Sequence, residues 1–580
     1  MNRTDIKATL AIALFMLWPK VVLAQDISQI AKSDPLIITG AVGTQNTYYH
    51  SSMGNGFASP LTNTLWANLN VSVYGISMPF SFYYVNSSTS FNYPHFSFNL
   101  SPRYKNWTGH FGRSSMPFSS YVMNVSFNGV GLEYRASKFH MGAFYGQLRN
   151  AINDNPENPD ARTPQYRRMG WGFYVGYGNS RNAVDLYLLR AYDRLSSIDE
   201  QWRSYISPQE NLVVGVRART TPTKWLSFSA NAAVSAFTSN TEAPKMGEGQ
   251  MEQWDKVFDV RYTSLARFAG DVSMNINLNN FHTSLFYRMV QPDYTSLGTY
   301  YMSNNYQGIG VNMSTSLFKK LSLSATFSGQ EDNLSNKQLY TTRGFVYNAN
   351  ASTSLSKNLY LSVGYNGYLQ TQSDGRIQVN DSTRIHRIMH SLYVTPSYNL
   401  SGTNIDHMFS VSCSYTENKD LNRFSTGESD VKTMAAGLSH SMHVKSWETS
   451  FITSLNHQQS DGYDTRYTSD ILSFTADRAF LQEKNLHAAA TVSLCYNDIR
   501  DKERMLSAGA DMSISYTLKK VHAFSFAAGM NKYNDINITD DESSYRTTEI
   551  NASLNYTYTF TLLELKKKGE AKEKSKKVKK

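Results

Sequence analysis

The stretch MLSAGADMSISYTLKK (residues 505–520) alternates apolar and polar side chains along almost its whole length. Every second residue from Leu506 to Leu518 is apolar, and the residues between them are Ser, Gly, Asp or Thr. Because successive side chains of a β-strand point to opposite faces, this pattern predicts a strand with one apolar and one small-polar face. The segment therefore raises the question of which two environments it separates.

The same two-residue period recurs along most of the chain. Apolar residues alternate with small or polar ones in residues 65–73, 281–289, 486–497 and 550–562. No segment beyond residue 30 repeats its apolar residues about every 3.6 positions over three turns, as a helix would. Charged residues make up only 18% of the chain and aromatic residues 13%, a composition that favours strands over long helices.

The length of the alternating runs identifies the environments. Each run covers roughly 9–14 residues, as a tilted strand needs to cross a bilayer, whereas strands of soluble proteins average about 5–6 residues. An open sheet edge would leave unpaired backbone groups in hydrocarbon, so the sheet must close. The predicted fold class is therefore all-β: a large transmembrane antiparallel up-and-down β-barrel of roughly 26 strands, an even number with an error of about four.

The N-terminus predicts a secretory signal over residues 1–24. Arg3 and Lys7 precede the apolar run Ala8–Trp18, which is too short to span a bilayer, and a small residue, Ala24, ends the segment. The alternative is an uncleaved N-terminal anchor. No Pro-rich, Gly/Ser-rich or charged linker interrupts the chain before Leu565. The predicted parts are a signal (1–24), a short periplasmic lead (25–34), the barrel (35–565) and a Lys-rich disordered periplasmic tail (566–580).

The basic charge of the chain lies mostly at its ends. Residues 566–580 (KKKGEAKEKSKKVKK) carry nine Lys and two Glu, hence +7, and the signal carries +2, which leaves about +1 of the formal +10 for the body. The net positive charge of the chain is therefore no evidence for a basic surface on the barrel, and a nucleic-acid partner is not predicted. The tail is a candidate contact for anionic lipid or a partner protein, and the alternative is a solvated end. The candidate contact residues are Lys566, Lys567, Lys568, Lys576 and Lys577.

Connections between the runs differ in length. Long polar ones occur at residues 150–167, 193–209 and 240–262, and short ones at 178–182 and 519–521. In barrels of this class short turns lie in the periplasm and long loops outside, which predicts periplasmic termini. Aromatic residues near strand ends fit either interfacial girdles or ordinary packing; examples are Trp225, Trp447, Tyr516 and Phe560.

The two cysteines are predicted to stay free. Cys413 falls on the apolar parity with Phe409 and Val411, whereas Cys495 falls on the polar parity with Ser493 and Asn497. Side chains on opposite faces of one wall cannot meet. An exported chain of this size with two cysteines is also no disulfide framework.

Part of the sequence resembles a known family. The segments DPLIITGAVGTQNTYYHSS, VSVYGISMPFSFYY, the run from FNLSPRYKNW to HMGAFYGQL, and RRMGWGFYVGYGNSRNAVDLYLLRAYD resemble a family of outer-membrane β-barrels from Bacteroidota-type bacteria. The likeness covers about residues 34–195. It implies an outer-membrane location and a porin-like barrel, but no site residues. The Lys-rich ending departs from barrels that finish on a terminal aromatic, and Phe560 is set back from the end.

Catalytic and metal motifs are scarce. The sequence has no phosphate loop, no GxSxG elbow and no GxGxxG after a strand. His386 and His390 have the outer spacing of a zinc helix but lack its Glu, and four residues of strand span about 13 Å. His440 and His443 would point to opposite faces. No cofactor or metal is predicted.

The polar face offers a small set of charged residues. They are candidates for lumen-lining groups that select solutes by charge and size, and the alternative is paired charges that merely fill a polar interior. The candidates are Arg217, Arg219, His282, Arg288, His487 and Asp511.

Three functions follow from this architecture. The first is an outer-membrane channel or translocation pore without covalent chemistry, its width partly filled by loops or by the first hundred residues. The second is a scaffold or secretion-complex partner that binds periplasmic or surface proteins besides outer-membrane lipid. The third, a hydrolase, would need a catalytic set clustered at one rim, and none is visible.

Overall fold

The structure is a computed structural model that describes most of the chain from Leu36 to Leu565. The described residues are 36–54, 60–86, 96–154, 162–246, 258–480, 483, 485–500, 502–536 and 546–565. The predicted signal, lead and Lys-rich tail lie outside the described residues.

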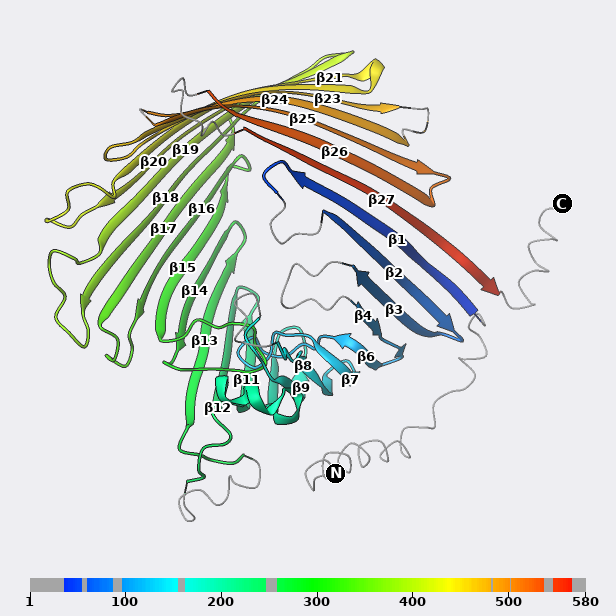
Figure 1. Ribbon diagram of the computed structural model, residues 1–580, viewed down its shortest axis with the longest axis vertical. Helices are drawn as coiled ribbons and strands as arrows, with labels where there is room; N and C mark the ends of the chain where they lie inside the picture. Colours follow the sequence, from blue (N-terminus) through cyan, green and yellow to red (C-terminus); the bar gives the residue numbers. More distant parts are fainter. Residues whose placement is uncertain are drawn as a thin grey trace.

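All 27 described strands belong to one antiparallel sheet that closes on itself (Figure 1). The strands pair in chain order, and β1 pairs with β2 on one side and with the last strand, β27, on the other. The first nine strands are β1 (Leu36–Ser51), β2 (Leu61–Val73), β3 (Ile76–Val85), β4 (Phe96–Leu100), β5 (Arg103–Tyr104), β6 (Trp107–Ser114), β7 (Phe127–Arg135), β8 (Phe139–Arg149) and β9 (Arg167–Gly178).

The remaining strands are mostly longer. Those from β10 to β18 are β10 (Ala183–Arg194), β11 (Glu210–Thr223), β12 (Leu226–Thr238), β13 (Ser264–Leu278), β14 (Phe281–Val290), β15 (Tyr306–Leu317), β16 (Leu321–Asp332), β17 (Tyr340–Ser354) and β18 (Leu359–Asp374). The last nine are β19 (His386–Ser401), β20 (Ile405–Asp420), β21 (Val431–Val444), β22 (Thr449–Asp461), β23 (Arg466–Phe480), β24 (Leu486–Ile499), β25 (Glu503–Leu518), β26 (His522–Asp535) and β27 (Arg546–Leu565).

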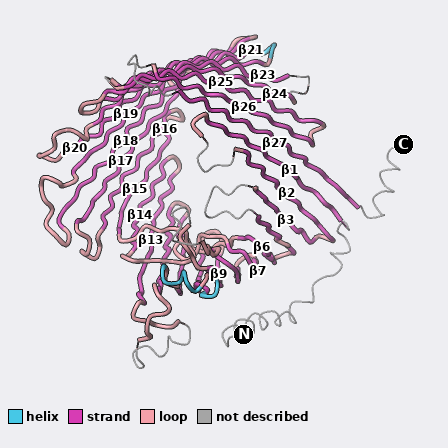
Figure 2. Tube along the Cα trace, in the orientation of Figure 1, coloured by secondary structure: helices cyan, strands magenta, loops and turns pink. Residues whose placement is uncertain are grey.

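Among the described residues, the helical segments are short 3₁₀ turns in the connections (Figure 2). They cover Leu195–Ser197, Glu200–Tyr205 and Lys445–Trp447. Within the described residues, no helix is long and apolar enough to cross a membrane.

Two of the short strands share one position in the wall. Both β4 and β5 lie between β3 and β6, because Phe80 pairs with Leu100 of β4 and Ser77 pairs with Arg103 of β5. The 27 strands therefore occupy 26 positions. The even number follows from closure, since β1 and β27 could not otherwise run antiparallel. The predicted barrel of roughly 26 strands is confirmed.

Connections of two kinds alternate around the barrel. Those at one end have two to five residues, and those at the other end have three to twenty-five. Lys519 and Lys520 show how the short ones form: with φ of 51° and 59° they turn β25 directly into β26, as hairpins with the twist of the strands require. Strand β1 begins and β27 ends at the short-turn end.

The two faces of the wall differ as the alternation predicts. Leu186 and Val216 pair across β10 and β11, and both are exposed, at 52% and 37%. Tyr187 and Val213 on the opposite parity are almost completely buried, at 2% and 0%. Chain segments that fold into the ring cover these two residues, so their parity faces the interior. The apolar parity faces outward.

The buried core lies inside the barrel, against one sector of the wall. It joins the inward face of strands β7–β14 to two connections that fold inward, residues 115–126 after β6 and residues 291–305 after β14. We expected either loops or the first hundred residues to fill the interior. The described part of residues 36–100 lies mainly in wall strands β1–β4, and the inward segments are loops. The core members are Met116, Phe118, Tyr121, Val122, Met123, Val125, Phe127, Phe144, Tyr174, Tyr187, Leu189, Val213, Ala233, Ala269, Val290 and Tyr294.

Candidate functional site

The two inward connections bind each other directly, and we call them the inward pair (residues 115–126 and 291–305). The backbone N–H groups of Asn124 and Val125 donate to the carbonyl oxygen of Gly298, at 3.0 and 3.1 Å. The Tyr294 hydroxyl donates to the carbonyl oxygen of Tyr121 at 2.8 Å. These bonds join segments about 170 residues apart in the chain into one unit.

Glycines on the inward face let the pair approach the wall. A Cβ added at Gly215 would lie 2.6 Å from Cγ2 of Val122, and one at Gly142 would lie 2.6 Å from Cε of Met116. Both distances are shorter than a carbon–carbon contact permits. The alternation of glycine with larger residues in β7–β11 therefore forms a seat for the inward pair. Its inward glycines are Gly131, Gly142, Gly172 and Gly215.

Buried polar groups of the wall hold the pair in register. The side chain of Asn211 is fully buried; its Oδ1 accepts from the backbone N–H of Leu297 at 3.0 Å, and its Nδ2 donates to Ser235 Oγ at 2.7 Å. The Ser119 hydroxyl donates to Asn231 Oδ1 at 2.7 Å. A buried polar group is costly unless it is bonded, so these contacts fix one position.

Two phenols of the inward pair, those of Tyr121 and Tyr294, are neutral at ordinary pH. Burial raises the pKa of Tyr294 above its usual value. Burial also raises the pKa of Tyr121, and a hydrogen bond with Asp271 acts in the same direction. Because only the protonated phenol can donate to a carbonyl, these shifts favour the bonded arrangement.

An ion cluster lies on the inward face beside the core. Asp185, which is 6% exposed, accepts from Arg217 at 2.9 Å and lies 2.8 Å from His140 Nε2. The Tyr187 hydroxyl donates to the same carboxylate at 3.2 Å. Arg217, a residue selected from the sequence, is therefore tied to a carboxylate, although its side chain is still 45% exposed.

The other predicted residues occupy separate parts of the inward face. Arg219 donates to the Asn179 carbonyl at 3.1 Å, near a short turn. His282 Nδ1 lies 3.1 Å from Asn277 Oδ1. Arg288 bonds Tyr306 near the inward pair. Their register shares the parity of the core residues, while their role in solute selection stays a prediction.

The remaining two candidates lie across the ring, on β24 and β25 (Figure 1). His487 pairs in register with Ser515, and Asp511 pairs with Thr491. A Cβ at Gly529 would meet Oδ1 of Asp511 at 2.2 Å, which places that carboxylate over the glycine of the next strand. The structure therefore does not gather the six predicted residues into one site.

The sector that includes His487 and Asp511 has a different lining. None of the buried core residues comes from strands β15–β27 as described. The inward parity there consists mainly of Ser, Thr and Asn; Asn312, Ser314 and Ser316 of β15, for example, are exposed. The described interior is thus packed and charged along β7–β14, whereas its lining along β15–β27 is mainly small and polar.

The histidine pair and the two cysteines considered in the sequence lie on strands β19, β20 and β24. His386 and His390 both lie on strand β19, where Tyr365 Oη lies 2.6 Å from His390 Nδ1. Within the described residues, no group of three His, Cys, Asp or Glu could hold a metal ion. Cys413 and Cys495 are both free, as predicted. Cys413 is exposed on the outward parity, and Cys495 contacts Asn497 Oδ1 on the inward parity at 3.4 Å.

Sequence reasoning missed the inward pair and its anchors, Asn211 and Asp185. One signal was present. In GVGLEYR (residues 129–135) and MGWGFYVGYG (residues 169–178), glycine recurs on the polar parity, where other strands carry Ser, Thr or Asn. Repeated glycines on one face of a strand indicate that another segment of the chain approaches that face closely.

Comparisons with known proteins add little to this geometry. No family model matches the chain, and no curated protein matches it. Its similarity to a Bacteroidota-type family therefore stays a prediction. Among solved structures, the chain is similar to the translocation pore of the P pilus usher PapC, with 10% identity, a TM-score of 0.35 and coverage of 90% of this chain and 100% of that one.

Two further solved structures are similar at the same level. OccAB2 of Acinetobacter baumannii has 11% identity, a TM-score of 0.30 and coverage of 61% of this chain and 93% of that one. OprD of Pseudomonas aeruginosa has 12% identity, a TM-score of 0.30 and coverage of 65% and 95%. Scores this low carry no functional argument. The chain's own strand pairing makes it a closed 26-position antiparallel β-barrel with an apolar outward face.

Proposed function

We propose that the protein is a water-filled channel or translocation pore of a bacterial outer membrane, without covalent chemistry. The observation that supports it is the closed wall with an apolar outward face and a small-polar inward face. An apolar band on the outside suits lipid, and a lining of Ser, Thr and Asn suits water. In this proposal the short turns and both chain ends lie in the periplasm.

The width of the barrel favours passage through its middle. With strands about 4.8 Å apart and tilted by about 40°, a circular wall of this strand number is about 50 Å across between backbones. The core contacts of the inward pair lie in the β7–β14 sector. The inward pair would narrow the lumen from one side. The ion cluster of Asp185 and Arg217 would lie on the wall, on β10 and β11, beside the remaining path.

Planar-bilayer recording of the purified full-length protein tests this function. The expected result is stepwise ionic current that persists at neutral pH without a partner. Liposome swelling with uncharged sugars of increasing size provides the size limit. A folded barrel that passes neither ions nor sugars would overturn the proposal.

A second function, a scaffold or secretion partner that holds other proteins, is supported by the uncovered sector. A path this wide would leak small solutes across the membrane unless another molecule occupied it. Strands β15–β27 offer such an occupant a mainly small-polar surface, as far as the structure describes them. The tail residues 566–580 would add a basic contact in the periplasm.

Affinity purification from native membranes separates the two functions. The full chain and a variant that lacks residues 566–580 are solubilised in mild detergent and compared by quantitative mass spectrometry. A stoichiometric protein partner that is lost with the tail would favour the scaffold. A barrel that purifies alone and conducts would favour the channel.

A further inference from the structure

The short connections at one end of the barrel are rich in basic residues. Twelve of them join successive strands, from the turn after β2 to the turn after β25. Their described residues include ten Lys or Arg, all exposed, against two acidic residues, Glu448 and Glu483. We call the ten basic residues the basic rim. They are Lys105, Lys138, Arg181, Lys224, Lys319, Lys320, Lys357, Lys445, Lys519 and Lys520.

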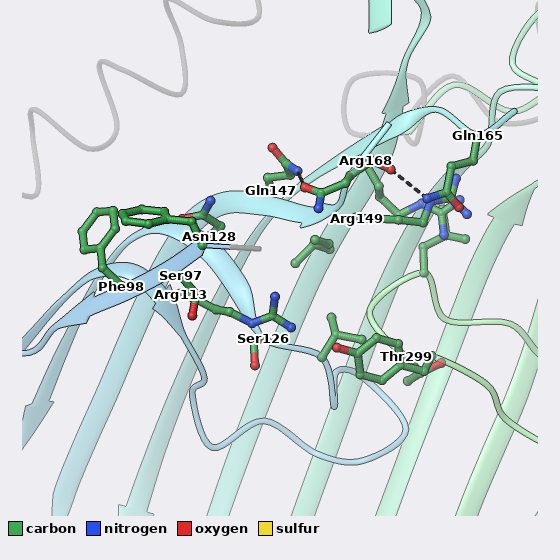
Figure 3. A pocket seen from close by; sticks show the side chains of 16 residues that line it. Ser97, Phe98, Arg113, Ser126, Asn128, Gln147, Arg149, Gln165, Arg168 and Thr299 are labelled. Carbon is green, nitrogen blue, oxygen red and sulfur yellow. Dashed lines mark hydrogen bonds between the residues drawn. The ribbon is translucent and has the colours of Figure 1, made fainter. Parts of the chain in front are cut away.

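The connections at the opposite end, as far as they are described, carry balanced charge. Their described residues, with the 3₁₀ segments included, comprise ten basic and ten acidic residues. Some of these are paired, as Arg162 is with Asp154 at 2.8 Å. Arg149 and Arg168 line a pocket of about 240 Å³ beside the inward pair (Figure 3), and they reach the carboxylate of Asp193 at 3.5 and 2.8 Å. Among the described connections, the excess of positive charge therefore lies at the short-connection end.

Carboxylates of the chain do little to neutralise the basic rim. Lys445 lies 2.9 Å from Asp406, and within the described residues no other member of the basic rim forms a salt bridge. Lys105 lies over the ring of Tyr104, with its amine 5.4 Å from the centroid. Exposed charges of one sign along a rim create a positive potential that attracts anions. The charge of the basic rim is therefore available to a partner outside the chain.

The geometry of the turns does not explain these lysines. Lys105, Lys319, Lys519 and Lys520 all have φ between 51° and 59°, in the left-handed region. Glycine and asparagine adopt this conformation with less strain than lysine does. The chain therefore carries lysine where the backbone alone would favour another residue, which indicates that the charge itself has a role.

Exposed aromatic side chains accompany the basic rim. Trp225 follows Lys224, and Phe318 precedes Lys319; their side chains are 45% and 87% exposed. Trp447, in the connection between β21 and β22, is 58% exposed. Aromatic residues form girdles where a barrel crosses the membrane–water interface, and a lysine there extends its amine toward the headgroups. The pattern of the short connections is thus typical of the headgroup region of a bilayer.

We propose that the basic rim binds the phosphate groups of anionic phospholipids in the leaflet that surrounds it. Basic residues near a membrane surface attract anionic lipids. A leaflet contacts a barrel all the way round, and eight of the twelve short connections, spread from β5 to β26, contribute to the basic rim. A single bound protein would instead require the charges to gather in one sector. This binding rests on the membrane location in the proposed function, but not on conduction.

Lipid selectivity of the full-length protein in bilayers of dioleoyl phosphatidylcholine tests the proposal. Electron spin resonance compares how strongly the barrel immobilises spin-labelled phosphatidylglycerol and spin-labelled phosphatidylcholine. The rim variant removes four charges with asparagine, which suits left-handed turns: Lys319→Asn/Lys320→Asn/Lys519→Asn/Lys520→Asn. The control removes four charges from the long connections: Lys245→Asn/Lys337→Asn/Arg376→Asn/Arg423→Asn. All three proteins keep the Lys-rich tail, so the tail cannot account for a difference between them.

The wild-type protein should prefer phosphatidylglycerol by roughly twofold or more, and the preference should fall in the rim variant but not in the control. In 1 M salt, where the screening length is about 3 Å, the wild-type preference should also fall. The salt comparison needs no variant to fold.

Three results would overturn the proposal. The first is equal affinity of the wild-type protein for the two lipids. The second is a preference that the rim variant retains, or that the control loses to the same extent, in barrels shown by circular dichroism to be folded. The third is an acidic protein that purifies from native membranes with the wild type but not with the rim variant, in the absence of any lipid preference.

Discussion

At the scale of single residues, glycines on the inward face of the wall determine where the inward pair lies. Gly142 and Gly215 leave room for Met116 and Val122. Glycine has no side chain that could hydrogen-bond the inward pair, and Asn211 provides such a bond by accepting from the backbone N–H of Leu297. These positions carry no chemistry of their own. They determine which part of the lumen is filled.

Filling the seat should displace the inward pair. In Gly215→Leu the new side chain occupies the space of Val122, at an expected cost of about 1–3 kcal/mol to the attached arrangement. We expect higher single-channel conductance and faster proteolysis within residues 115–126. Gly329→Leu is the control, because a Cβ there lies 3.7 Å from its only close neighbour, Phe345. Equal behaviour of the two variants would contradict the role of the glycine seat.

Alkaline pH should weaken the attachment of the inward pair to the wall. The raised pKa of Tyr294 means that the attached state holds its proton more tightly than the free state, so attachment is favoured below pH 10.0 and is lost as the pH rises through the folded-state pKa. Conductance should therefore stay constant from neutral pH to about pH 10.0 and increase as the pH rises further. In Tyr294→Phe the alkaline increase should shrink, since that group cannot ionise. An unchanged increase would exclude Tyr294 as its cause.

At the scale of elements, each strand is a two-sided unit whose register assigns every side chain to lipid or lumen. A slip of one residue would exchange the two faces. The cysteines report this assignment directly, because Cys413 lies on β20 at outward parity and Cys495 on β24 at inward parity.

Thiol labelling in liposomes should distinguish the two strands' faces. A charged, membrane-impermeant thiosulfonate is expected to modify Cys495 and leave Cys413 unreacted. In this arrangement the Cys413 thiol faces hydrocarbon and the Cys495 thiol faces the lumen. Single-cysteine variants Cys413→Ser and Cys495→Ser, analysed by mass spectrometry, assign the label. Labelling of Cys413 alone would mean that the faces are reversed.

At the scale of the whole molecule, closure makes every strand necessary. Strand β27 pairs with β1 from Ser51 to Leu36 and with β26 on its other side, so that no edge remains in the bilayer.

Two truncations test this dependence on closure. Removing residues 546–580 should leave β1 and β26 with unpaired edges, and the chain should aggregate during refolding into detergent. Removing only residues 566–580 should permit folding to the same strand content by circular dichroism. Efficient folding of the shorter chain would contradict the closed ladder.

The sequence by itself determined the class of fold, the strand number within its error, the two faces and the uneven connections. All of these follow from a period of two and from run length, which are local properties. Only the tertiary structure decided that residues 115–126 and 291–305 fold inward and that Arg217 meets Asp185. Those contacts join residues 32 to about 170 positions apart. The pairing of β10 with β11 brings Arg217 to Asp185, and the inward folding of two connections brings Tyr294 to Tyr121.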